Sequence, residues 1–98
     1  DLCFVDFFGI KTSASTVFAK IAARSGAPVV PGFALWSASE RRYVLRFEEP
    51  VEIAGDAEAD TQTIHAVIEG VIRRHPEQWL WIHRRFKTRP PGEASLYD

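Results

Sequence analysis

The sequence predicts an α/β fold with the element order β-α-β-β-α, followed by a basic and aromatic tail. The prediction rests on an apolar run at residues 2–8, an alternating pattern between residues 28 and 48, and apolar residues at helical spacing from Ile64 to Ile72. The chain has 98 residues, of which 46% are hydrophobic and 26% are charged. Such values are typical of one small globular domain.

The first strand is predicted at residues 2–8, LCFVDFF, and ends at Gly9. The hydroxyl-rich segment over residues 9–16 is interpreted as a turn or as the entry to a helix. A helix over about residues 14–25 follows, because apolar residues recur at helical spacing and Gly26 supplies a stop. These apolar residues are Val17, Phe18, Ile21 and Ala22.

Residues 28–48 predict an antiparallel hairpin. Its first strand falls within residues 27–36, where Pro31 and Gly32 indicate a bulge or an edge. Its second strand, YVLRFEE from Tyr43, alternates with a period of two, which is typical of a half-buried strand. The segment PVEIAG at residues 50–55 is expected to extend or re-pair that strand.

The clearest periodicity in the chain predicts a second helix of about 15–19 residues. Asp56 or Asp60 is expected to cap its start, and Pro76 marks its exit. Residues 90–98 are interpreted as a loose end. The predicted apolar stripe consists of Ile64, Val67, Ile68, Val71 and Ile72.

Charge and cysteine content narrow the class of protein. The formal net charge is -1, so no global excess of charge demands nucleic acid or anionic lipid. The single cysteine, Cys3, excludes an intrachain disulfide, and no apolar run approaches the ~20 residues of a membrane span. The chain has no methionine and opens inside a predicted strand, so we interpret it as a piece of a longer protein.

Few residues suggest catalysis or metal binding. His65 and Glu69, four apart on the second helix, form either a metal-binding pair or, as we expect, a surface pair, because no third ligand is apparent. Cys3 lies in an apolar strand, where we expect an inert thiol. The hydroxyl groups before the first helix either bind an anion or cap the helix. These hydroxyl groups belong to Ser13, Ser15 and Thr16.

The segment HPEQWLWIHRRFKTRPPGE, residues 75–93, combines aromatic and basic side chains. Its aromatic residues either plug the core or touch a membrane interface, and its cations are either solvated or in contact with phosphate. His83 has a structural, surface or contact role beside these cations. Arg84 and Arg85 are alternatively buried partners of acids such as Asp6 or Glu77. The candidate phosphate-binding cations are Arg84, Arg85, Lys87 and Arg89.

This segment resembles the C-terminal signature of the bacterial lipid A biosynthesis acyltransferases, of the lauroyl and myristoyl transferase type, in the lysophospholipid acyltransferase superfamily. Three upstream blocks resemble the same family: VDFFG, SGAPVVPGF and RYVLRFEEPVEI. Asp6 stands where the family has proline in the first block. The tail positions that fit the family pattern are Pro76, Glu77, Gln78, Trp79, Trp81, His83, Arg84, Arg85, Phe86, Lys87, Thr88, Arg89 and Pro90.

The chain departs from the family at two sites. Of the family's Thr-x-Thr-Gly motif between strand and helix, this chain retains only Thr16, at the entry to the first helix. The family's catalytic motif, a His followed after four residues by Asp or Glu, is absent, because the residues five after His65, His75 and His83 are not acidic. The family's membrane anchor is absent as well. The resemblance therefore places no catalytic residue in this chain.

The resemblance implies that residues 1–98 form the C-terminal part of a single acyltransferase domain, the second half of an α/β sandwich and the floor of an acyl-binding groove. The reaction would transfer a fatty acyl chain from an acyl carrier protein or coenzyme A thioester to a lipid A precursor glycolipid. The implied location is the cytoplasmic face of the inner membrane. No cofactor, metal or nucleic acid is implied. Substrate or phosphate contacts fall to Thr16, Arg84, Arg85, Lys87 and Arg89.

Two other functions remain open at the level of sequence. The chain is alternatively a non-catalytic module that binds glycolipid or membrane, or part of an inactive relative whose upstream histidine is lost. An upstream reading frame that encodes the histidine motif distinguishes the enzyme from both.

Overall fold

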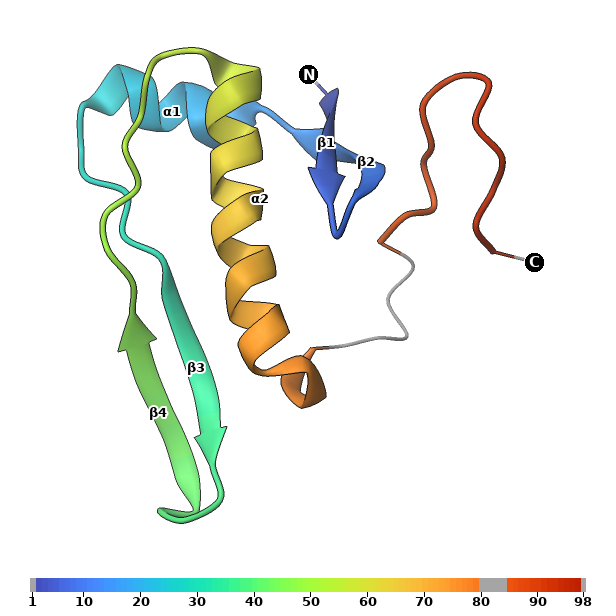
Figure 1. Ribbon diagram of the computed structural model, residues 1–98. Helices are drawn as coiled ribbons and strands as arrows, with labels where there is room; N and C mark the ends of the chain where they lie inside the picture. The colour runs from blue at the N-terminus through green and yellow to red at the C-terminus, as the bar shows by residue number, and fades with distance from the viewer. Residues whose placement is uncertain (1, 80–84, 98) are drawn as a thin grey trace.

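The computed structural model describes residues 2–79 and 85–97. Two β-hairpins and two helices form a mixed α/β molecule in which the long helix α2 lies between the hairpins (Figure 1). The α/β class is confirmed, but the predicted order β-α-β-β-α is wrong, because the observed order is β-β-α-β-β-α. The elements are β1 (Leu2–Phe7), β2 (Ile10–Ser15), α1 (Val17–Ser25), β3 (Gly32–Ser37), β4 (Arg42–Phe47), α2 (Ala57–Arg74) and the 3-10 turn η1 (Pro76–Gln78).

The strand β2 is the element that the sequence prediction missed. It pairs antiparallel with β1, with Cys3 opposite Ala14 and Val5 opposite Thr12. The two-residue turn between them has positive φ at Phe8 (55°) and at Gly9 (75°), as a turn that follows the strand twist requires. The sequence IKTSAS lacks an apolar alternation because only Thr12 and Ala14 are buried in it, and both are small.

The helix α1 is confirmed, with a later start than predicted because β2 extends to Ser15. Gly26 ends it in the left-handed conformation (φ 69°), and its N–H bonds to the carbonyl of Ala22 at 3.2 Å. Ala22 is buried, whereas the larger members of the predicted stripe, Phe18 and Ile21, are exposed. The helix therefore packs through its small side chains.

The hairpin of β3 and β4 is confirmed, and β3 begins directly after Pro31. The segment after β4 re-pairs as expected, since Val51 N–H donates to the carbonyl of Val29 at 2.7 Å. One face of this hairpin is exposed although it carries large apolar side chains. These are Trp36, Tyr43, Leu45 and Phe47.

The helix α2 has 18 residues and begins as the sequence predicts. The carboxylate of Asp56 accepts from the N–H groups of Glu58 and Ala59, both at 3.1 Å, which identifies Asp56 as the N-cap. Asp60, only 2% exposed, instead accepts from the N–H groups of Ala54 and Gly55 at 2.9 and 3.0 Å. The two aspartates thus fix both the first turn and the loop that leads into it.

Candidate functional site

Among the residues of the tail that the structure describes, Arg85 reaches back to β2 and α2. Its Nη1 donates to Thr12 Oγ1 at 2.9 Å and to the carbonyl of Ser13 at 2.7 Å. Its Nη2 lies 2.8 Å from His65 Nε2, and its guanidinium carbon lies 5.6 Å from the centre of the Phe7 ring. Thr12 Oγ1 donates in return to the carbonyl of Arg85 at 2.7 Å. This cluster ties the tail to β2 and α2.

The cluster favours the neutral form of His65. Burial first, and then the positive charge of Arg85, lower the pKa of His65 below its usual 6.5, against a raising contribution from the carbonyl of Thr61. A neutral imidazole accepts from Arg85 at Nε2 and donates from Nδ1 to Thr61 O at 3.0 Å. Burial also lowers the pKa of Arg85. The expectation that His65 and Glu69 form a surface pair is wrong, because His65 is half-buried against Arg85.

A polar face of α2 holds the first hairpin by its backbone. The amide of Gln62 accepts from the N–H of Asp6 at 2.7 Å and donates to its carbonyl at 2.9 Å. Two turns of helix further, Glu69 accepts from the N–H of Phe8 at 2.6 Å and pairs with Arg73 at 2.9 Å. The Phe8 N–H is the main reason that the pKa of Glu69 is lowered. The bonds from Gln62 and Glu69 to the backbone of Asp6 and Phe8 could not be predicted, because backbone partners leave no pattern in the sequence.

The other candidate cations occupy different environments. Arg89 is 12% exposed and donates to the carbonyls of Lys11 and Ala94 and to the carboxylate of Glu93, the last at 2.6 Å. Lys87 is exposed. Arg84 and His83 lie outside the described residues. Arg85 bonds to neutral groups, and in the described part of the chain it forms no ion pair with Asp6 or Glu77.

The hydroxyl-bearing residues before α1 have different structural roles, one in the strand β2 and two at the start of the helix. Ser13 lies in β2, where its carbonyl accepts from Arg85. Ser15 Oγ accepts from the N–H of Val17 at 3.2 Å, which supports a capping role. Thr16 is buried at the N-cap position and makes no side-chain capping bond to the helix. The geometry therefore supports capping by Ser15 in place of Thr16.

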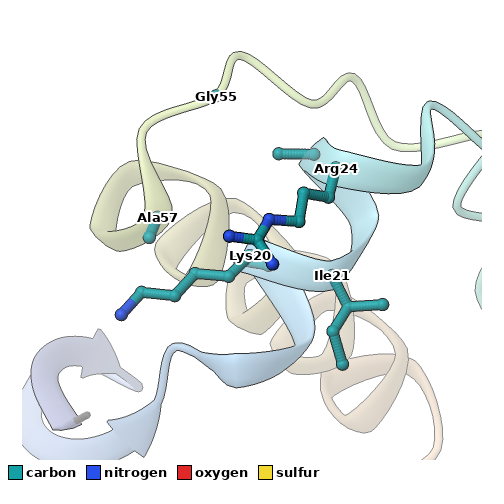
Figure 2. A pocket seen from close by; sticks show the side chains of 7 residues that line it. Lys20, Ile21, Arg24, Gly55 and Ala57 are labelled. Carbon is teal, nitrogen blue, oxygen red and sulfur yellow. The ribbon is translucent and has the colours of Figure 1, made fainter.

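A second group of cations lines a surface groove of 450 Å³ beside α1. Figure 2 shows Lys20 and Arg24 extending from this helix toward the start of α2 at Ala57, with Ile21 pointing away. Within residues 2–79 and 85–97 no cluster of three metal-binding side chains occurs. Among these residues no helix is long and apolar enough to cross a bilayer. Cys3 is buried as expected, and burial together with Glu58 raises its pKa.

Comparison with known proteins identifies the family. Residues 1–88 match the family model of the bacterial lipid A biosynthesis acyltransferases. The chain is 38% identical over 96 residues to the lipid A biosynthesis palmitoleoyltransferase of Escherichia coli, and the match covers 96% of the chain and 31% of that protein. It is 37% identical over 97 residues to the lauroyltransferase of the same organism, covering 96% of the chain and 32% of the relative.

A third E. coli relative, the lipid A biosynthesis myristoyltransferase, is 31% identical over 98 residues, covering 96% of the chain and 30% of that protein. The chain thus spans about a third of the length of the curated relatives it matches. The match includes both hairpins, both helices and the basic tail as far as Thr88. The chain belongs to the bacterial lipid A biosynthesis acyltransferase family.

Proposed function

We propose that this chain is the C-terminal part of an acyltransferase that transfers a fatty acyl group from a thioester donor to a lipid A precursor. The observation that carries the proposal is the family match over residues 1–88, together with 38% identity to a palmitoleoyltransferase. The donor would be an acyl carrier protein thioester or acyl-CoA. The full-length protein would act at the cytoplasmic face of the inner membrane, where a glycolipid acceptor is anchored.

The proposed reaction needs a base outside this chain. A sugar-linked hydroxyl oxygen attacks the thioester carbonyl carbon, an ester C–O bond forms, the C–S bond breaks, and the hydroxyl proton passes through the base to the leaving thiolate. The base would be the histidine of the upstream His-x4-Asp/Glu motif, with its acidic residue as orienting partner. In this chain His65 is committed to Arg85 and to Thr61, which leaves it no role in that step.

The proposed phosphate contacts differ in how well their surroundings support them. Lys87 comes first, because it is exposed, and Arg84 belongs to the same proposal. Arg85 and Arg89 already donate to oxygen atoms of the chain itself, so a structural role is better supported for them. Thr16 is buried, and a substrate contact there requires the helix entry to open.

The decisive experiment is an assay of the full-length protein with acyl carrier protein thioesters, acyl-CoA and a lipid A precursor. Acylated product that disappears when the upstream histidine is replaced by alanine would support the enzyme. Binding of glycolipid without product, from any donor, would leave the alternative of a non-catalytic module.

The assignment of Lys87 has its own test. In the full-length enzyme, Lys87→Gln is expected to raise KM for the phosphorylated acceptor roughly five- to tenfold with little change in kcat, because it removes one charge-assisted contact. The matched control is Arg42→Gln on the β3–β4 hairpin, where the native cation pairs with Glu40 at 2.7 Å. An unchanged KM would assign Lys87 to the solvated surface.

A further inference from the structure

Two arginine side chains of the tail bind the backbone along one edge of β2. Arg85 Nη1 donates to the carbonyl of Ser13 at 2.7 Å. Arg89 Nη1 donates to the carbonyl of Lys11. Backbone carbonyls alternate in direction along a strand, so those of Lys11 and Ser13, two residues apart, point to the same edge. The other edge of β2 pairs with β1, and the two arginines thus lie where a third strand would lie, beside the first hairpin (Figure 1).

Further bonds hold each arginine in its place. The carbonyl of Arg85 accepts from Thr12 Oγ1 at 2.7 Å, so the backbone of this residue is bound as well as its side chain. Its Nη2 lies 2.8 Å from His65 Nε2 on α2. The side chain of Arg89 is 12% exposed, and its Nη2 donates to the carboxylate of Glu93 at 2.6 Å. The tail is therefore attached to the hairpin at two positions, four residues apart.

Lys87 lies midway between these two attached positions. Both Lys87 and Thr88 are exposed, whereas the N–H of Phe86 donates to Tyr97 Oη at 3.0 Å. A segment of three residues that is bound at both ends has few backbone conformations. The entropy of ordering its backbone is then lost on folding and does not weaken the binding of a ligand. The same lysine on an unattached tail would lose that entropy when it bound an anion.

We propose that Arg85 and Arg89 are positioning residues, which hold residues 86–88 on the edge of β2 so that Lys87 meets a phosphate group of the acceptor. The inference rests on the proposed function, in which Lys87 makes that contact. The arginines act through Lys87 and not by a phosphate contact of their own, because their donors are engaged by oxygen atoms of the chain. The planar fork of a guanidinium forms several such bonds at once, which a lysine ammonium group in its place would not.

The test is a double-mutant cycle in the full-length enzyme, with an acyl carrier protein thioester as donor and the phosphorylated lipid A precursor as the varied substrate. Arg85→Met is expected to raise KM for the acceptor about five- to tenfold with little change in kcat, as Lys87→Gln does. Added to Lys87→Gln, it should raise KM less than about twofold further, because the contact that it positions is already lost. Arg89→Met should give the same cycle, and it carries the test if Arg85→Met does not fold.

Two further measurements separate positioning from direct contact. Arg85→Lys retains the charge without the planar fork, so it should raise KM nearly as much as Arg85→Met. Amide exchange at Lys87, followed by mass spectrometry, needs no turnover and should be faster in Arg85→Met and Arg89→Met than in the wild type. The matched control is Arg42→Met on the β3–β4 hairpin, where the native cation pairs with Glu40 at 2.7 Å. It should change neither KM nor this exchange.

Non-additive effects on KM, together with faster exchange at Lys87 in both methionine variants, would support the proposal. Effects on KM that multiply in the double variants would overturn it, as would a wild-type KM in Arg85→Lys, which would indicate that the arginine meets the phosphate itself. Exchange at Lys87 that neither methionine variant alters would overturn it as well. In each of these cases turnover by the wild type leaves the proposed function standing. Absence of acylated product from the wild type with every thioester would overturn the proposed function, and this inference with it.

Discussion

At the scale of single residues, the structure gives Arg85 a different role from the one that its sequence context suggests. Its sequence context suggests a cation that faces phosphate, whereas its side chain donates to Thr12, Ser13 and His65 in the interior. A guanidinium can bond to a hydroxyl group, a carbonyl and a ring nitrogen at once because its five donors lie in one plane. An ammonium group would reach fewer of these partners.

The Arg85 contacts predict a stability change. Arg85→Met keeps most of the stem and removes the donors, and we expect it to lower the free energy of unfolding by about 2–3 kcal/mol, since two acceptors on β2 lose a charged partner. Arg85→Lys should recover less than half of this loss. Urea unfolding followed by circular dichroism measures the change. The matched control is Lys87→Met at an exposed position, with an expected change within about 0.5 kcal/mol. Equal effects of both methionine variants would contradict the structural role of Arg85.

The lowered pKa of His65 predicts that the free energy of unfolding depends on pH. Its pKa is lowered in the folded protein, so the unfolded chain, with a pKa near 6.5, binds the proton more readily. The free energy of unfolding should therefore be greatest above pH 6.5, decrease as the pH falls below that value, and level off below the folded-state pKa. Glu69 titrates at lower pH, because its own pKa is lowered from 4.5.

The measurement is urea unfolding at intervals between pH 7.5 and 5, compared with His65→Gln, which cannot titrate. The variant is expected to show a flatter profile over this interval. Parallel profiles for the two proteins would show that other groups cause the dependence.

At the scale of secondary-structure elements, the confirmed predictions share a local cause. The helix α2 is specified by its apolar spacing and by Asp56, and β3 and β4 by alternation on either side of a polar loop. The missed strand, β2, has a weak pattern of its own. It is held by pairing with β1 and by the bonds of Thr12 and Ser13 to Arg85, which lies more than 70 positions away in the sequence. Propensity reasoning reads local sequence, so it cannot find such contacts.

The start of α2 predicts different roles for two aspartates. Asp60→Asn should lower the free energy of unfolding by about 1–3 kcal/mol, because the amide group turns an N–H donor toward Ala54 or Gly55, which are themselves donors. Asp56→Asn should change it by only a few tenths of a kcal/mol, since asparagine caps a helix about as well as aspartate. Thermal unfolding of both variants, in parallel with the wild type, tests the difference. If Asp56→Asn were the more damaging, the cap would be the main determinant of this helix end.

At the scale of the whole molecule, the chain is thin, with extents of 47 × 41 × 16 Å. Its buried apolar residues are mostly small, and several large ones are exposed on the β3–β4 hairpin and on α1. A two-stranded sheet has little stability of its own, so the contacts that join the two hairpins to α2 matter more than in a larger domain. The tail supplies some of these contacts.

The tail, expected to be loose beyond residue 89, folds back on itself. Glu93 and Ala94 bind Arg89, and Tyr97 Oη accepts from the N–H of Phe86 at 3.0 Å. Removal of residues 93–98 is therefore expected to lower the free energy of unfolding by about 1–2 kcal/mol and to speed amide exchange at Phe86. Hydrogen exchange followed by mass spectrometry measures this, with Tyr97→Phe as the variant that removes one bond alone. Unaltered exchange after truncation would restore the interpretation of a loose end.

The sequence by itself determined the family, the α/β class, the β3–β4 hairpin, both helices and the lack of a catalytic histidine motif in this chain. These features depend on spacing, capping and motif, which are local properties. Only the tertiary structure decided that residues 10–15 form a strand, that Arg85 bonds to β2 and α2 while Lys87 is exposed, and that the apolar stripe of α2 is only partly buried. Each of these depends on which distant groups meet, since partners far apart in the chain set burial, pKa and hydrogen bonding.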